Sequence, residues 1–218
     1  MIKISQLLRT VLPVEKARMT QVQDIFRKNF SAVAEYADKI PDMLNNPIKY
    51  GYTSVLLISE TSDFKITGFS LILYFPNIRS GLLDFIAVCP DIRGSGTGGA
   101  LYEASREYLK QIGASSLYLE SLPDNPHAVK DTEMLKQNKR RLKFYEGYGA
   151  RPIVGTEYET PISEWPAPYL LYDALDNPKP LKRSHCRAAI RTILTKKYSH
   201  LVGPEYIEHV VESVIDDP

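Results

Sequence analysis

The spacing of apolar residues along the chain changes several times between the period of a helix and that of a strand. After Pro13, apolar residues such as Val22, Ile25 and Phe26 recur at helical spacing and predict a helix over 14–30. A second helix is expected over 32–44, where Pro41 either breaks it or begins another turn. Both segments precede a region dominated by β-rich runs.

Two of these β-rich runs lie on either side of a Ser/Asp loop and predict a hairpin. Further runs and amphipathic stretches alternate down to about residue 174, which predicts an α/β fold with a mixed sheet. The expected strands cover 2–11, 54–60, 66–74, 82–88, 116–122, 151–159 and 169–174, and the expected later helices cover 97–112 and 132–148.

The C-terminal part of the chain differs in composition from what precedes it. Residues 176–180 resemble a linker, and helices are expected at 185–198 and 204–215. We therefore expect a main domain over 1–175 and a helical extension over 176–218. The basic residues of the extension form either a solvated helix face or a docking surface for a second copy or a partner domain. They are Arg183, Arg187, Arg191, Lys196 and Lys197.

The most informative segment lies where strand 82–88 gives way to helix 97–112. Four glycines, Gly94, Gly96, Gly98 and Gly99, fall in or beside this turn. The first amides of a helix have no partner within it, and they lie at the positive end of the helix dipole. Such a turn predicts a binding site for a phosphate or pyrophosphate.

Two well-known phosphate-binding patterns fit this turn poorly. A P-loop requires Gly-Lys-Ser/Thr, but Gly99 and Ala100 follow Gly98. The dinucleotide pattern G-x-G-x-x-G is met formally by Gly94, Gly96 and Gly99, with Glu120 about twenty residues further on. However, residues 89–93 separate the strand end from the first glycine, so a dinucleotide oxidoreductase is the weaker alternative.

A third pattern matches better. Arg93-x-x-Gly96-x-Gly98, after a strand that ends in Val-x-Pro, resembles the acetyl-CoA pyrophosphate loop of the GNAT superfamily of N-acetyltransferases. Asn138, followed by Tyr145 seven residues later, resembles the second signature of that family. The resemblance covers about 55–172, and it departs from the family where Tyr148-Gly149 replaces the usual Gly-Phe.

The resemblance implies a role for each matching position. Backbone amides of the turn would hold the pyrophosphate of acetyl-CoA, and the backbone of the preceding strand would bind the pantetheine arm and the thioester carbonyl. Asn138 would contact a pantetheine amide, and Tyr145 would protonate or hydrogen-bond the departing sulfur. The implied turn residues are Arg93, Gly94, Ser95, Gly96, Thr97 and Gly98, and the implied strand residues are Ile86, Ala87 and Val88.

The sequence does not identify a single residue as the general base. Asp84 shares a strand face with Ile86 and Val88. Glu120 lies in an apolar strand, where a carboxylate is a stronger base than in water. A chain of water molecules without a dedicated side chain is the third option.

The acceptor is expected to be an amine. The resemblance implies a small amine, a polyamine or a protein lysine, and a non-catalytic acyl-CoA-sensing module is the alternative. Long segments at 123–131 and 160–168 are candidate lids. Aromatic side chains that could line an amine pocket are Tyr50, Tyr52, Tyr158, Trp165 and Tyr169.

The composition limits the classes of binding partner that we expect. Lys plus Arg number 27 and Asp plus Glu 26, so a broad basic surface for nucleic acid is not expected. No apolar run has the length of a membrane span, and polar residues interrupt the N-terminal segment. Cys89 and Cys186 lie in unlike surroundings, which fits a reducing compartment. We expect a cytoplasmic protein without a metal site.

Overall fold

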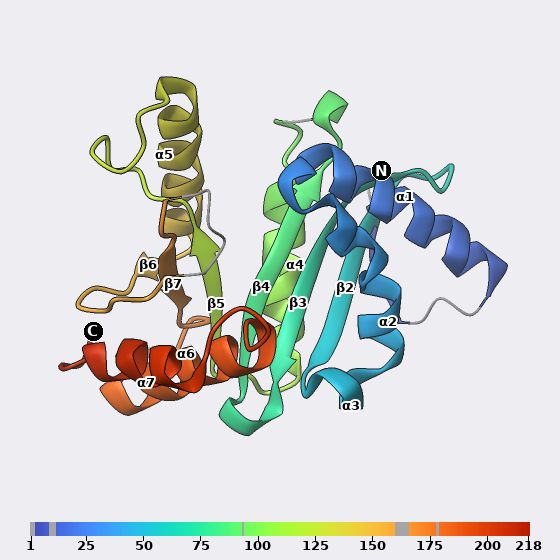
Figure 1. Ribbon diagram of the computed structural model, residues 1–218. Helices are drawn as coiled ribbons and strands as arrows, with labels where there is room; N and C mark the ends of the chain where they lie inside the picture. The colour runs from blue at the N-terminus through green and yellow to red at the C-terminus, as the bar shows by residue number, and fades with distance from the viewer. Residues whose placement is uncertain (1–2, 9–11, 93, 160–165, 178) are drawn as a thin grey trace. The chain divides into compact units, whose positions relative to one another are not determined.

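The computed structural model describes residues 3–8, 12–92, 94–159, 166–177 and 179–218. It confirms the α/β class, with a seven-stranded sheet in the order β1-β2-β3-β4-β5-β7-β6 (Figure 1). The chain divides into two compact units, one formed by 1–76 with 83–113 and the other by 77–82 with 114–218. Each unit is described by itself below.

The first unit is an antiparallel sheet with helices on both faces. Strand register places Gln6 opposite Leu57 and Leu56 opposite Leu71. Its strands are β1 (Lys3–Leu7), β2 (Thr53–Glu60), β3 (Ile66–Phe75) and most of β4 (Ser80–Val88). Its helices are α1 (Pro13–Asn29), η1 (Ser31–Asp38), α2 (Ile40–Asn45), α3 (Pro47–Tyr50), η3 (Pro90–Ile92) and α4 (Thr97–Gln111).

Alternation along β3 explains why α1 and α4 lie on opposite faces of this sheet. Phe69 packs against Phe26 of α1, with ring centroids 6.1 Å apart. Its neighbour Gly68 faces the other way, where a Cβ would lie 3.0 Å from a methyl carbon of Leu101 in α4 and 2.7 Å from the Ala87 carbonyl oxygen. Glycine at this position therefore lets α4 and the end of β4 approach β3 closely.

The predicted helix over 32–44 is wrong as one element. The chain forms the 3₁₀ helix η1, then turns at Lys39 and begins the separate helix α2, with Pro41 in its first turn. Proline lacks the N–H that a helix interior needs, but it is tolerated in the first turn, so Pro41 lies at the start of α2 and not inside a continued η1.

The second unit contains the remaining strands and three longer helices. Strand β7 lies between β5 and β6, and Glu120 of β5 is paired with Leu170 of β7. Its strands are β5 (Ser116–Ser121), β6 (Arg151–Pro152) and β7 (Tyr169–Asp173). Its helices are α5 (Thr132–Gly147), α6 (Arg183–Lys197) and α7 (Pro204–Ser213), and the short η2 (Pro76–Ile78) joins the two units.

The strand expected over 151–159 is mostly wrong, because β6 has only two residues. Pro152 cannot donate to a neighbouring strand. The Ile153 amide still donates to the Leu170 carbonyl at 2.8 Å, and Gly155 then adopts a φ of 67°, which turns the chain away from the sheet.

The C-terminal helices belong to the same compact unit as β5 and β7. Basic side chains of α6 bind the end of α7: Arg183 donates to the Ile215 carbonyl at 2.6 Å and Arg187 to the Val214 carbonyl at 2.9 Å. Arg191 forms a bidentate pair with Glu208. Arg183 and Arg187 thus lie at the negative end of the α7 dipole, and all three arginines have partners within the unit.

Candidate active site

Two glycines give the turn before α4 an unusual backbone conformation. Gly94 and Gly96 adopt φ angles of 86° and 84°, in the left-handed region that other residues disfavour. Among the described residues, apart from the immediate chain neighbours, no heavy atom lies within 4 Å of the place where a Cβ would stand on either glycine. Arg93, the first residue of the predicted turn, lies outside the described residues.

The amides of this turn divide into engaged and available donors. The Ser95 amide donates to the Ile92 carbonyl at 3.2 Å, so it is used within the turn, and contact of Ser95 with a cofactor stays a prediction. The amides of Thr97, Gly98 and Gly99 have no backbone acceptor in the described part of the chain. The N-cap residue of α4 is Gly96, which has no side chain that could accept from these amides. Amides in this position, at the positive end of a 15-residue helix, can bind an anion.

Strand β4 leads directly to this turn. Asp84, Ile86 and Val88 alternate along it, and all three are partly exposed. The Val88 carbonyl accepts from the Asn29 side chain at 3.4 Å, and the next amide, that of Cys89, donates to the Thr67 carbonyl at 2.8 Å. These contacts fix the end of β4. The binding of a thioester to the backbone of Ile86, Ala87 and Val88 stays a prediction.

Asp84 has a defined partner within the first unit. The Tyr36 hydroxyl of η1 donates to its Oδ2 at 2.7 Å. The ring of Tyr36 also lies 5.0 Å from the ring of Phe85. Sequence reasoning identified Asp84 but missed Tyr36 and Phe85, because 48 residues separate the tyrosine from the carboxylate and no spacing rule connects them.

In the second unit, α5 holds Asn138 and Tyr145 on its buried side. Asn138 is 1% exposed and donates to the Pro123 carbonyl at 2.9 Å, so it also holds the segment that leaves β5. Burial raises the pKa of Tyr145 to about 12, while the nearby Arg141 lowers it slightly. Tyr145 is therefore a neutral phenol near pH 7, the form that can donate a proton.

Glu120 is engaged by three donors of its own unit. Its Oε1 accepts from the Tyr158 hydroxyl, and its Oε2 accepts from Lys197 Nζ at 3.0 Å and from the Tyr198 hydroxyl at 2.8 Å. Three donors occupy most of the lone-pair sites of its carboxylate. This arrangement favours an anchoring role for Glu120 over proton transfer.

The other predicted aromatics have varied surroundings. Tyr158 is buried against Glu120, and Tyr169 is partly exposed in β7. The Tyr50 hydroxyl donates to Asp42, and the rings of Tyr50 and Tyr52 lie 5.6 Å apart. Trp165 lies outside the described residues.

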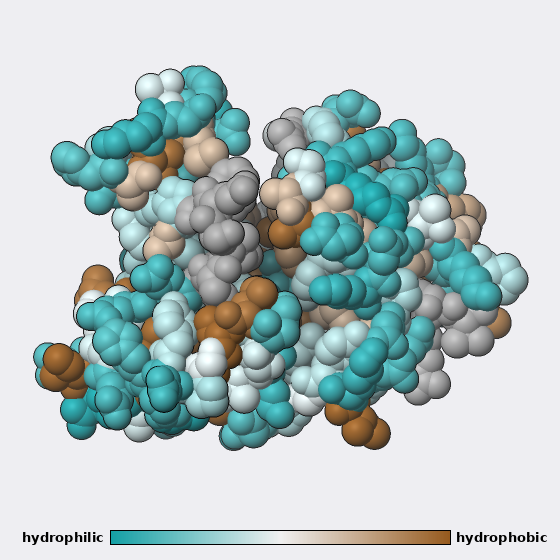
Figure 2. All heavy atoms as spheres, viewed as in Figure 1, coloured by the Kyte–Doolittle hydropathy of each residue, from teal (hydrophilic) through white to brown (hydrophobic). Residues whose placement is uncertain are grey.

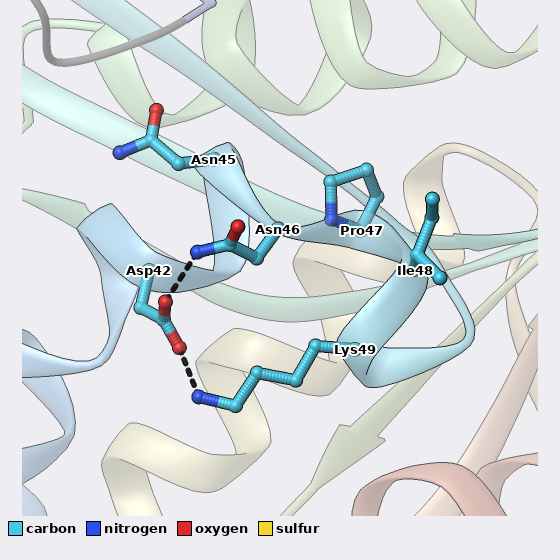
Figure 3. A pocket seen from close by; sticks show the side chains of 6 residues that line it. All are labelled: Asp42, Asn45, Asn46, Pro47, Ile48 and Lys49. Atoms are coloured by element: carbon cyan, nitrogen blue, oxygen red, sulfur yellow. Dashed lines mark hydrogen bonds and ion pairs between the residues drawn. The ribbon is translucent and has the colours of Figure 1, made fainter.

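A surface hollow lies over α2 and α3 (Figure 3). In it Asp42 accepts hydrogen bonds from Lys49 and from Asn46, each 2.5 Å long. The Lys49 bond is the main cause that lowers the pKa of Asp42 to about 2. The polar groups satisfy one another, so the hollow offers no reactive group. It is lined by Asp42, Asn45, Asn46, Pro47, Ile48 and Lys49.

Two kinds of feature are absent from the described ranges. No three His, Cys, Asp or Glu side chains there are grouped as a metal site would require. None of the helices there combines the length and the apolar character needed to cross a membrane. In Figure 2, hydrophilic residues cover most of the visible surface. Lys136, Lys139 and Lys143 of α5 are exposed.

Comparison with protein families gives a match over residues 19–149 to the acetyltransferase (GNAT) family. The match includes Asp84, the glycine turn and both α5 candidates. Comparison with curated protein sequences gives no match.

Solved structures with the same fold include several acetyltransferases. An aminoglycoside 6'-N-acetyltransferase complexed with coenzyme A is 17% identical, with a TM-score of 0.59 over 82% of this chain and 99% of that one. The Enterococcus faecium aminoglycoside 6'-N-acetyltransferase is 17% identical over the same shares, with a TM-score of 0.57. A GNAT acetyltransferase from Staphylococcus aureus Mu50 is 17% identical, with a TM-score of 0.53 over 81% and 100%. At these identities the likeness concerns the fold.

Proposed function

Because this chain belongs to the GNAT family of acetyltransferases, we propose that it transfers an acetyl group from acetyl-CoA to a primary amine. The family assignment makes the chain an acyltransferase. The identity of the acyl donor, the class of acceptor and the residues that act are the parts that we propose.

The observation that carries the proposal is the start of α4. Thr97, Gly98 and Gly99 present amides without a backbone acceptor in the described ranges, directly after two glycines with positive φ. A pyrophosphate carries the charge that such amides bind. The open space at the missing Cβ positions of Gly94 and Gly96 lets a bulky phosphate approach the backbone.

The remaining groups fit the proton transfers that aminolysis of a thioester requires. Acetyl-CoA supplies the activated acyl group. The amine must lose a proton as its nitrogen bonds to the acyl carbon, and the sulfur must leave as a thiolate or thiol. We propose that Asp84 removes the proton from the amine and that the Tyr145 phenol donates a proton to the departing sulfur. Glu120, with three donors of its own, is the second candidate for the base.

The test of the reaction is release of free CoA from acetyl-CoA in the presence of a panel of primary amines, with the acetylated product identified by mass. Calorimetric titration with CoA is the parallel binding measurement. Binding together with amine-dependent release supports the proposal. Binding without transfer to any amine indicates the acyl-CoA-sensing module instead, and absence of CoA binding overturns both.

A matched pair of variants tests which carboxylate acts as the general base. Asp84→Asn and Glu120→Gln each remove one carboxylate without changing its size. We expect Asp84→Asn to lower kcat about 100-fold at neutral pH, as loss of a general base does, and to leave CoA affinity unchanged. The reverse order of the two variants in kcat would assign the base to Glu120.

A further inference from the structure

The Asp84 carboxylate lies beside a cluster of aromatic rings in the first unit. Phe85 is at the centre of the exposed part of this cluster, with ring centroids 4.9 Å from Phe30, 5.0 Å from Tyr36 and 4.6 Å from the buried Phe26. Phe30, Tyr36 and Phe85 are only partly buried. One side of the cluster, at Phe26, therefore belongs to the buried core, while the other rings keep part of their surface exposed.

The Tyr36 side chain connects these rings to the carboxylate. Its hydroxyl donates to Asp84 Oδ2, while its ring packs on Phe85 and lies 5.9 Å from Phe26. Successive side chains alternate between the two faces of a strand, so it is Tyr36, which contacts both Asp84 and Phe85, that brings the carboxylate close to the rings. Together they present an anion beside an apolar surface.

The charges around the cluster are unsuited to a molecule with many ammonium groups. Lys39 Nζ lies 5.7 Å from the centre of the Tyr36 ring, so one cation already faces the cluster. Two acids of the neighbouring elements, Asp24 and Asp38, pair with Arg27. A second or third ammonium on the acceptor would meet Lys39 and would compete with Arg27 for its partners.

We infer that the acceptor is a primary monoamine carried on an aromatic or other apolar body, with its amine at Asp84 and its body on Phe85, Phe30 and Tyr36. This inference rests on the proposed acetyl transfer and names its substrate class. Ring faces also attract an ammonium group directly, which adds to the recognition of such an amine. Phe85 and Tyr36 are thus residues that determine acceptor specificity.

The test compares kcat/KM for phenethylamine, propylamine and spermidine at one acetyl-CoA concentration. We expect phenethylamine to exceed each of the other two about 10-fold, the discrimination that one apolar contact provides. Spermidine or propylamine as the better substrate would overturn the inference and leave the acetyl transfer standing. Transfer to none of the three, with CoA bound, would overturn the inference, and the wider amine panel would then decide the proposed function separately.

Two variants test whether the preference for phenethylamine over propylamine arises at Phe85. Phe85→Leu removes ring surface beside Asp84 and should lower the phenethylamine-to-propylamine ratio about 5-fold or more. Phe75→Leu makes the same change at a buried ring of the same unit, which packs against Tyr52 outside this cluster. It should leave the ratio unchanged even if it lowers stability. An equal effect of both variants on the ratio would show that the preference does not arise at Phe85 and would overturn its assignment.

Discussion

At the scale of single residues, the state of the Tyr145 hydroxyl connects burial to chemistry. A phenol can assist a leaving thiolate only while it keeps its proton, and burial raises its pKa to about 12. Tyr145→Phe keeps the ring in place and removes this donor. We expect kcat to fall about 10- to 100-fold with little change in the KM for acetyl-CoA, as loss of a proton donor does.

Steady-state kinetics at saturating amine check this expectation, with Tyr148→Phe as the control. Tyr148 follows α5 directly and its ring lies 5.4 Å from that of Phe144, but no role in proton transfer is assigned to it. Equal kcat values for the two variants would contradict the role of Tyr145.

The same phenol predicts how stability depends on alkaline pH. In the unfolded chain a tyrosine loses its proton near pH 10, but in the folded chain Tyr145 holds it to about pH 12. The protonated Tyr145 phenol therefore makes its full contribution to the free energy of unfolding below pH 10. This contribution is lost between pH 10 and 12, by about 1.4 kcal/mol per pH unit. Urea unfolding at pH 9.5 and 11 should show a smaller loss of stability for Tyr145→Phe than for the parent chain. An identical loss would mean that the phenol is not buried in solution.

At the scale of elements, the turn before α4 depends on glycine for its backbone. Gly96→Ala places a Cβ at a φ of 84° and should cost about 1 kcal/mol of stability. The added methyl would also stand where we expect the pyrophosphate, so the KM for acetyl-CoA should rise about 10-fold. Gly155→Ala is the matched control, because Gly155 also has a positive φ, 67°, and open space around its Cβ position. A similar rise in KM for Gly155→Ala would show that strain alone explains the effect.

The elements differ in how well the sequence predicted them. The strand, glycine turn and helix from β4 to α4 were predicted to within two residues, because apolar alternation and glycines act locally. The break between η1 and α2 was left open by Pro41, and β6 was predicted too long, since its pairing depends on β7, which lies far along the chain. The Tyr36–Asp84 bond had no local signal at all, because folding alone brings η1 to β4.

At the scale of the whole molecule, the C-terminal helices are connected to the sheet through Glu120. Lys197 and Tyr198, at the end of α6, bind this strand residue across 77 and 78 positions of sequence. Composition marked 176–218 as an extension of a main domain. The contacts place these residues in one compact unit with β5 and β7, and no rule of spacing could have matched Glu120 to Lys197.

The contribution of this anchor can be measured by removing the cation. The side chains of Lys197 and Glu120 are only 10% and 15% exposed, so Lys197→Met leaves a carboxylate in a largely dry site with two hydroxyl donors. We expect a loss of about 3 kcal/mol in the free energy of unfolding. Glu120→Gln added to Lys197→Met should restore part of it, because the uncompensated charge is then gone.

The pair Arg191–Glu208 in the same unit is the control, since it also joins two elements but is 47% and 51% exposed. Arg191→Met should cost less than about 1 kcal/mol, as exposed ion pairs do. If Lys197→Met costs no more than Arg191→Met, Glu120 does not depend on its ammonium partner. A large difference between the two variants instead identifies the Lys197–Glu120 pair as a buried anchor of the C-terminal helices, while the kcat values of Asp84→Asn and Glu120→Gln decide which carboxylate is the base.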